Sequence, residues 1–192
     1  EILKEYQSTI SPEGVEVIGS IDGLDATGLS FDSREVQTGN IFFCISGGTH
    51  DGHEHVIEAI EHGAVAIVAE RELSVSVPQI IVEDTREAMG YISCIYFGFP
   101  SRELNVVGVT GTNGKTTTTH LITAILNTAG VSCESIGTLT GVLTTPEAPD
   151  LQRQFRSLVD GGIKSVVMEV SSHALSQHRV TGIEFDIGVF TN

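Results

Sequence analysis

A glycine-rich segment between two apolar stretches constrains the fold more than any other feature of this sequence. Asn105–Val109 is mostly apolar, Gly111–Thr116 reads GTNGKT, and Lys115–Ala129 has the composition of a helix that Gly130 would end. Glycines let a turn curl so that successive backbone N–H groups point at one anion, and the following helix adds its partial positive charge. The order strand, glycine turn, helix therefore predicts a phosphate-binding loop in an α/β domain.

The residues of this loop have separate predicted roles. Lys115 is expected to reach the β- and γ-phosphates of a nucleotide, and the Thr116 hydroxyl is expected to ligate Mg²⁺. The predicted nucleotide-binding set is Gly111, Thr112, Asn113, Gly114, Lys115, Thr116 and Thr117. The match to the general pattern GxxxxGK[ST] is incomplete, because Val109 stands at the first glycine position. An ordinary glycine-rich turn is the alternative.

A second apolar strand ends in an acid. Ser165–Glu169 reads SVVME, and a carboxylate at the end of a strand beside a phosphate loop typically supports Mg²⁺. The predicted metal ligands are therefore Thr116 and Glu169, and the predicted catalytic residues are Lys115 and Glu169. The alternative is an acid that merely ends a strand.

Predicted strands and helices alternate along the rest of the chain, which indicates an α/β fold with mainly parallel sheets. In the first half the expected elements are an apolar run at Ile41–Ile45, a helix at Glu54–His62, strands at Ala64–Ala69 and Gln79–Val82, and a helix from the N-cap Asp84 to about Phe97. In the second half we expect a further helix at about Asp150–Asp160 and a strand at Phe185–Phe190. Leu121, Ile125 and Ala129 form the expected apolar stripe of the helix after the phosphate loop.

A segment rich in glycine, proline and serine separates the two α/β runs. It is Gly98–Leu104, which reads GFPSREL, and it places a domain boundary near Ser101. We expect a small N-terminal α/β domain at residues 1–100, followed by a P-loop, Rossmann-like, mainly parallel domain at residues 101–192. The second run stops at Asn192, directly after a predicted strand, so we expect that domain to be truncated and residues 1–192 to be poorly active alone.

Composition limits the partners and the compartment. The chain has 25 acidic and 10 basic side chains and a formal net charge of −15, which disfavours general binding to nucleic acid or to anionic membranes. A phosphate ligand must then be held locally, by backbone amides, a few placed cations and a metal ion. The three cysteines show no CxxC spacing, and no apolar run approaches the ~20 residues that span a bilayer. These features favour a cytoplasmic protein with reduced thiols.

Four segments of the chain occur together in one known family. They are the loop GTNGKTTTT, Phe31–Arg34 (FDSR), Thr144–Pro146 (TTP) and Met168–Val180 (MEVSSHALSQHRV). With them the chain resembles the Mur ligases, ATP-dependent enzymes that build the peptide stem of peptidoglycan precursors. The last two segments are most similar to the MurE branch, which adds the third stem residue to UDP-N-acetylmuramoyl-L-alanyl-D-glutamate.

The resemblance implies a ligand for each segment. It implies a UDP-binding N-terminal domain, the substrates ATP, UDP-N-acetylmuramoyl-L-alanyl-D-glutamate (UDP-MurNAc-L-Ala-D-Glu) and a diamino acid, the cofactor Mg²⁺, and a monomer. Positions that match family contacts to the uracil-nucleotide end are Phe31, Ser33 and the turn Gly48, Thr49 and His50. Positions that match contacts to the muramoyl-dipeptide are Thr144, Thr145, Ser171, Gln177 and Arg179.

Several alternatives remain open at this point. The chain could be a module that binds UDP-muropeptide or ATP without ligation, or a related ligase of the folylpolyglutamate or cyanophycin type. The sequence does not identify the third stem residue, whether meso-diaminopimelate, L-lysine or another. His50, His53 and His55 could suggest zinc, but their loose spacing and the absence of a nearby cysteine favour a structural or ligand-lining loop.

Overall fold

The computed structural model describes residues 1–10, 14–47, 51–140 and 143–192. The chain divides into two compact units, a first unit at Glu1–Ile95 and a second unit at Tyr96–Asn192. This division falls within the last turn of α3 (Thr85–Tyr96), whereas the sequence places a boundary near Ser101. Ser101 itself lies in the short 3₁₀ turn η4 (Pro100–Glu103).

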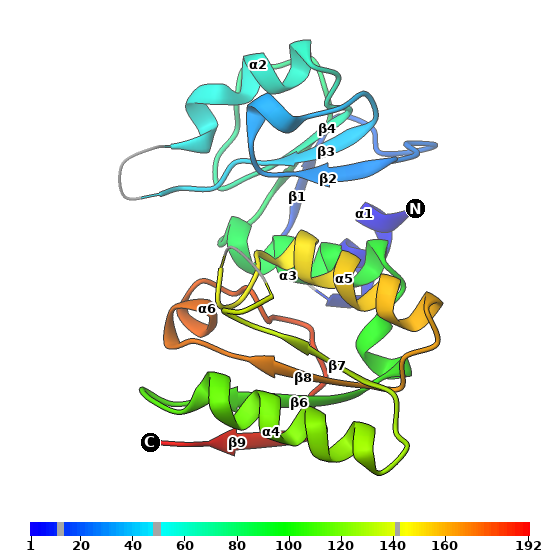
Figure 1. The fold of residues 1–192 in the computed structure, drawn as a ribbon. Helices are drawn as coiled ribbons and strands as arrows, with labels where there is room; N and C mark the ends of the chain where they lie inside the picture. The colour runs from blue at the N-terminus through cyan, green and yellow to red at the C-terminus, as the bar shows by residue number, and fades with distance from the viewer. Residues whose placement is uncertain (11–13, 48–50, 141–142) are drawn as a thin grey trace. The chain divides into compact units, whose positions relative to one another are not determined.

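The first unit is built on a five-stranded sheet with the order β1-β5-β4-β3-β2 (Figure 1). Its strands are β1 (Glu16–Ile18), β2 (Gly28–Ser30), β3 (Asn40–Phe43), β4 (Ala66–Ala69) and β5 (Gln79–Ile81). Strands β2 to β5 pair in parallel, and β1 joins the edge at β5 in the antiparallel direction. The sheet is therefore mainly parallel, as expected.

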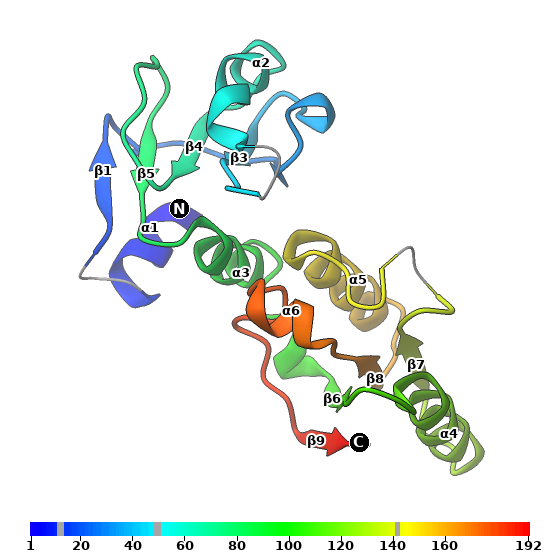
Figure 2. The same cartoon turned by 90° about the vertical axis from the view of Figure 1, so that its left-hand side faces the viewer.

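Both faces of this sheet are buried. Phe42 and Ile67 pack with α2 (Val56–Glu61), while Ile41, Phe43 and Val68, which alternate with them, are completely inaccessible. The helices α1 (Ile2–Glu5) and α3 lie on the side of the sheet opposite α2 (Figure 2). Strands buried on both faces read as continuous apolar runs, which explains why the sequence reveals the inner strands.

The element ends differ from the expectations in ways that have local causes. The helix expected at 54–62 begins as a 3₁₀ turn, η3 (Gly52–His55), before it becomes α2. Asp84 is confirmed as the cap of α3, since its Oδ1 accepts from the amides of Arg86 at 2.8 Å and Glu87 at 3.0 Å. Strands β1 and β2 were not predicted, because their sequences, EVI and GLS, lie among polar residues and glycines and do not form an apolar run.

The second unit holds a four-stranded sheet in which every pairing is parallel, in the order β7-β8-β6-β9. Its strands are β6 (Asn105–Thr110), β7 (Cys133–Ile136), β8 (Ser165–Glu169) and β9 (Ile187–Phe190). The predicted α/β class with mainly parallel sheets is confirmed for both units. Strand β7 was not predicted, because its sequence CESI lacks an apolar run.

Two helices cover opposite faces of this second sheet (Figure 1). On one face, Leu151 and Phe155 of α5 (Ala148–Asp160) pack with Val166 and are fully buried. The helix α4 (Lys115–Thr128) packs on the other face. The layers are therefore helix, sheet, helix, which is the usual way to bury a parallel sheet.

The predicted apolar stripe of α4 is wrong. Leu121 is 58% exposed and Ile125 is 66% exposed, whereas Ile122 and Leu126 pack against the sheet. Two neighbouring stripes of this helix are equally apolar, so the 3.6-residue period cannot choose between them. The phosphate loop sets the rotation of the helix about its axis. Thr116 must face β8 for its hydroxyl to reach Glu169.

The three cysteines are buried free thiols. Burial raises the pKa of the Cys44 thiol to about 12, which keeps it protonated at neutral pH. Among the described residues, no helix is long and apolar enough to cross a membrane.

Candidate functional site

The phosphate loop joins β6 to α4 and requires glycine at two places. Gly111 has φ +132° and Gly114 has φ +85°, a region that other residues rarely adopt. A Cβ at Gly111 would also lie 2.9 Å from the backbone nitrogen of Asn192. The loop conformation therefore depends on these glycines, as a turn that directs amides at an anion should.

Lys115 lies over the loop that precedes it. Its Nζ donates to the carbonyl of Gly111 at 2.7 Å, so the ammonium group is held above the curled backbone. A hollow of about 340 Å³ opens beside it. Its lining is Thr112, Asn113, Gly114, Lys115, Thr116, Thr117, Thr138, Thr144 and Glu169. The structure thus brings most of the predicted nucleotide-binding residues and the predicted metal ligands to one polar cavity.

Glu169 lines this cavity from the end of β8. It pairs in register with Val109 across β8 and β6, which places it beside the start of the loop, and it is 2% exposed. Its Oε2 accepts a 2.9 Å hydrogen bond from the Thr116 hydroxyl, and its Oε1 accepts one of 2.9 Å from the amide of Thr138.

The donor set of this cavity fits Mg²⁺. Thr116 and Glu169 present hard oxygen atoms within hydrogen-bond distance of each other, and Mg²⁺ usually takes one or two carboxylates together with phosphate and water oxygens. Within the described parts of the chain, no three His, Cys, Asp or Glu residues gather as a dedicated metal cage. A site that is completed by the nucleotide is the arrangement these residues suit.

The residues predicted to contact the muramoyl-dipeptide in the second unit converge on the same strand end. The buried Thr145 hydroxyl donates to the carbonyl of Glu169 at 2.9 Å and accepts from the amide of Ser171 at 3.2 Å. Ser171 caps the short helix α6 (Ser172–Ser176). The Thr144 hydroxyl lies 3.1 Å from that of Thr138. The backbone around Glu169 therefore connects the nucleotide side to this group.

Arg179 is held by three partners. Its guanidinium donates to the carbonyl of Thr145 at 2.9 Å and to the side-chain oxygen of Gln177 at 2.6 Å. It also forms a 2.9 Å ion pair with Glu147, and the two side chains are 13% and 15% exposed. A guanidinium suits a carboxylate or phosphate oxygen, and here Nη2 pairs with one carboxylate oxygen of Glu147.

In the first unit, Phe31 and Ser33 directly follow β2. Phe31 is half-buried, and Ser33 begins the 3₁₀ turn η2 (Ser33–Glu35) with a hydroxyl that donates to Glu58. Hydrogen bonds from Arg34 hold the turn and lower the pKa of Asp32 to about 2. Gly48, Thr49 and His50, the other positions predicted for the uracil-nucleotide end, lie outside the described residues.

His53 has a structural role in its unit. Its ring is 1% exposed, its Nδ1 contacts Asp51 at 2.5 Å, and its Nε2 accepts from the amide of Glu70 at 3.2 Å. A neutral imidazole with both nitrogens engaged has none left for a metal ion. The loop around Asp51 is thereby attached to the end of β4.

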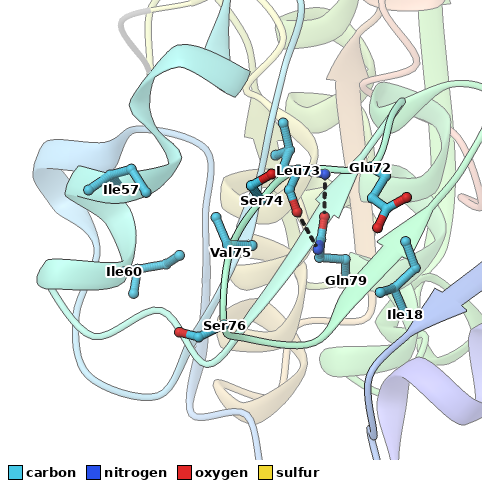
Figure 3. A pocket seen from close by; sticks show the side chains of 9 residues that line it. All are labelled: Ile18, Ile57, Ile60, Glu72, Leu73, Ser74, Val75, Ser76 and Gln79. Atoms are coloured by element: carbon cyan, nitrogen blue, oxygen red, sulfur yellow. Dashed lines mark hydrogen bonds between the residues drawn. The ribbon is translucent and has the colours of Figure 1, made fainter.

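A second hollow, of about 590 Å³, lies in the first unit beside α2 (Figure 3). Ile57, Ile60 and Val75 give it an apolar side, and the buried amide of Gln79 braces its wall through two hydrogen bonds to the backbone of Leu73, at 2.8 and 2.9 Å. None of the site residues predicted from the sequence lines this hollow.

Two protein-family models match this chain, and one of them covers all the residues that line the cavity around Glu169. Residues 25–96 match the model described as "Mur ligase family, catalytic domain", and residues 109–192 match "Mur ligase middle domain". Together these matches span well over half of the 192 residues.

The chain belongs to the Mur ligase family.

Curated relatives and solved structures show which members of the Mur ligase family this chain is similar to. The chain is 50% identical to the UDP-N-acetylmuramoyl-L-alanyl-D-glutamate–2,6-diaminopimelate ligase of Geobacillus thermodenitrificans (strain NG80-2), over 88% of this chain and 36% of the relative. A solved structure of a ligase with the same printed name has a TM-score of 0.74 and 28% identity, covering 87% of this chain and 36% of that one. The chain thus spans little more than a third of the length of these relatives.

A more distant Mur ligase structure contains a nucleotide. It is the MurF ligase from Thermotoga maritima in complex with ADP, with a TM-score of 0.56 and 27% identity, covering 76% of this chain and 32% of that one.

Two residues were not predicted from the sequence: Thr138, which lines the cavity, and Glu147, which pairs with Arg179. Thr138 lies in a stretch rich in Thr and Gly that shows no periodic pattern, and Glu147 follows the TTP segment as one of many acids. Thr138 could have been found from the order of the strands, since β7 is the neighbour of β8 and ends just before it. No sequence signal marks Glu147 as the partner of Arg179.

Proposed function

We propose that this Mur ligase chain forms the nucleotide-sugar-binding and ATP-binding part of a ligase that joins a diamino acid to UDP-MurNAc-L-Ala-D-Glu. ATP and Mg²⁺ would bind at Gly111–Thr117 with Glu169. The muramoyl-dipeptide would contact Thr144, Thr145, Ser171, Gln177 and Arg179, and the uracil-nucleotide end would contact Phe31, Ser33 and Gly48–His50. Cytoplasmic location and a monomeric state are part of the same proposal.

One observation carries this proposal. Glu169 accepts from Thr116 of the phosphate loop through its side chain and from Thr145 of the proposed substrate segment through its backbone. A single buried residue therefore connects the place for the transferable phosphate with the place for its acceptor. An enzyme that phosphorylates a bound carboxylate needs these two ligands side by side.

The proposed reaction makes an amide bond in two steps. The side-chain carboxylate of the D-glutamyl residue attacks the γ-phosphorus of ATP, giving an acyl phosphate and ADP. The amine of the diamino acid then attacks the acyl carbon, loses a proton, and phosphate leaves with the electron pair of the broken C–O bond.

The contribution of this chain is positioning and charge stabilisation. The ammonium of Lys115 and the amides of the loop would neutralise charge on the transferring phosphoryl group, and Thr116 and Glu169 would hold Mg²⁺. Mg²⁺, when bound, supplies further neutralisation of the phosphate oxygens. Few placed cations are sufficient, so the net charge of −15 does not prevent the binding of anionic substrates.

Calorimetric titration of the chain with UDP-MurNAc-L-Ala-D-Glu, and separately with a folate, tests the substrate class. We expect binding of the UDP-muropeptide and none of the folate. Tighter binding of the folate would overturn the proposal in favour of a folylpolyglutamate-type ligase. In a protein that contains this chain and binds both nucleotides, absence of ATP-dependent ligation would favour a binding module instead.

A further inference from the structure

The turn that follows β7 contacts the carboxylate of Glu169 from the side opposite the phosphate loop. We infer that Gly137 and Thr138 are positioning residues that set the orientation of this carboxylate, an inference that rests on the nucleotide and Mg²⁺ site proposed above. Neither residue belongs to the predicted ligand sets.

The strand register brings the turn to Glu169. β7 and β8 run in parallel with Ile136 paired to Met168, so the residue after each of these lies at the next step along the sheet. Those residues are Gly137 and Glu169. The amide of Thr138 then donates to Oε1 of Glu169 at 2.9 Å, while Thr116 donates to Oε2 at the same distance. Each carboxylate oxygen thus has one donor, and the donors come from different elements.

Gly137 leaves the space that the Glu169 side chain occupies. An ideal Cβ at this position would lie 2.8 Å from both Cγ and Cδ of Glu169 and would overlap Oε1. Cβ atoms do not approach other atoms this closely, so any larger residue must displace the carboxylate. The obstructing atoms belong to a flexible side chain, so the carboxylate can move while the backbone of the turn remains in place.

The turn is fixed by its own hydrogen bonds. The amide of Thr140 donates to the carbonyl of Gly137 at 3.0 Å, and the amide of Gly137 donates to the Thr140 hydroxyl at 2.9 Å. The Thr138 hydroxyl lies 3.1 Å from that of Thr144. A hydrogen-bonded turn therefore joins the carboxylate to the proposed substrate segment, which is the role of partners that orient a metal ligand.

Gly137→Ala tests the inference through the metal dependence of nucleotide binding. ADP is titrated calorimetrically into the 192-residue chain at a series of Mg²⁺ concentrations and in EDTA. We expect the Mg²⁺ concentration for half-maximal enhancement to rise about tenfold, as for other partners of metal ligands, with binding in EDTA unchanged. Gly188→Ala is the matched control, since a Cβ there meets no atom within 4 Å.

A double-mutant cycle separates positioning from a general effect on the fold. In a Glu169→Ala background, Gly137→Ala should cause no further change, because the group it displaces is gone. An equal loss of ADP binding in both backgrounds would overturn the inference.

The remaining outcomes distinguish the positioning role of Gly137 and Thr138 from the proposed function. If ADP binding depends on Mg²⁺ and Gly137→Ala behaves like the unmodified chain, the positioning role is wrong and the proposed function stands. If ADP binding never depends on Mg²⁺, both are wrong. Should Gly137→Ala fail to fold, hydrogen exchange of the Thr138 amide gives the answer: it should lose protection in Glu169→Ala, and unchanged protection would overturn the inference.

Discussion

Arg179 and Glu147 form a 2.9 Å ion pair in which the two side chains are 13% and 15% exposed. Glu147→Gln leaves the guanidinium in place without its counter-charge. We expect a loss in the free energy of unfolding that exceeds the ~1 kcal/mol of exposed pairs but stays below the ~3–5 kcal/mol of fully buried ones. Urea denaturation measures it.

The pair of Arg156 with Glu103 is the matched control for this substitution. Its distance is 2.8 Å, but Glu103 is 51% exposed. Glu103→Gln should therefore have a much smaller effect than Glu147→Gln. Equal effects would show that burial of the Arg179 pair contributes nothing to stability.

Lys115→Ala is expected to weaken nucleotide binding. Among the residues that line the described cavity, Lys115 is the only lysine or arginine. A hydrogen bond to a charged group contributes about 1.5–3 kcal/mol. The affinity for ADP, measured by calorimetry, should fall by about 10- to 100-fold. Lys164→Ala, at an exposed position of the same unit, should leave it unchanged, and the reverse pattern would contradict the assignment of the loop.

Leu151→Ala and Leu121→Ala should differ sharply in stability. Leu151 is fully buried between α5 and the sheet, so its truncation should cost about 2–5 kcal/mol. Leu121 is 58% exposed on the outer side of α4, so its truncation should change the free energy of unfolding by about 0.5 kcal/mol or less. Urea unfolding of the 192-residue chain measures both changes. Similar losses in the two variants would support the apolar stripe of α4 that was expected from the sequence.

The first unit should lose stability in acid. Hydrogen bonds from Arg34 lower the pKa of Asp32 to about 2, and hydrogen bonds from Arg71 and His53 hold the pKa of Asp51 below its ordinary value. Because both pKa values are lower in the folded state, the unfolded chain takes up protons first as the pH falls below about 4. The stabilisation is therefore present above about pH 4 and is lost toward pH 2.

Unfolding midpoints in urea at pH 5 and pH 3 measure this dependence. The double variant Asp32→Asn/Asp51→Asn removes both groups and should show a smaller difference between the two pH values. A difference as large as that of the unmodified chain would assign the acid sensitivity to other carboxylates.

Local patterns predicted much of the fold. The inner strands β3, β4, β6 and β8 are mostly apolar because helices cover both faces of their sheets. Their composition alone therefore indicates that they are buried. The cap Asp84 and the loop glycines Gly111 and Gly114 follow from backbone chemistry that involves only neighbouring residues. Strands β1 and β2 lack an apolar run and were not predicted.

The phosphate loop, the buried strands and the acid that ends β8 can be predicted from the sequence, because each depends on residues adjacent in the chain. Three other features depend on the folded chain: the stripe of α4 that faces the sheet, the turn that holds Glu169, and the pairing of Glu147 with Arg179. These relationships join residues 31 to 53 positions apart or depend on the order of the strands. Strand pairing and helix rotation create them, and a local pattern carries no information about either.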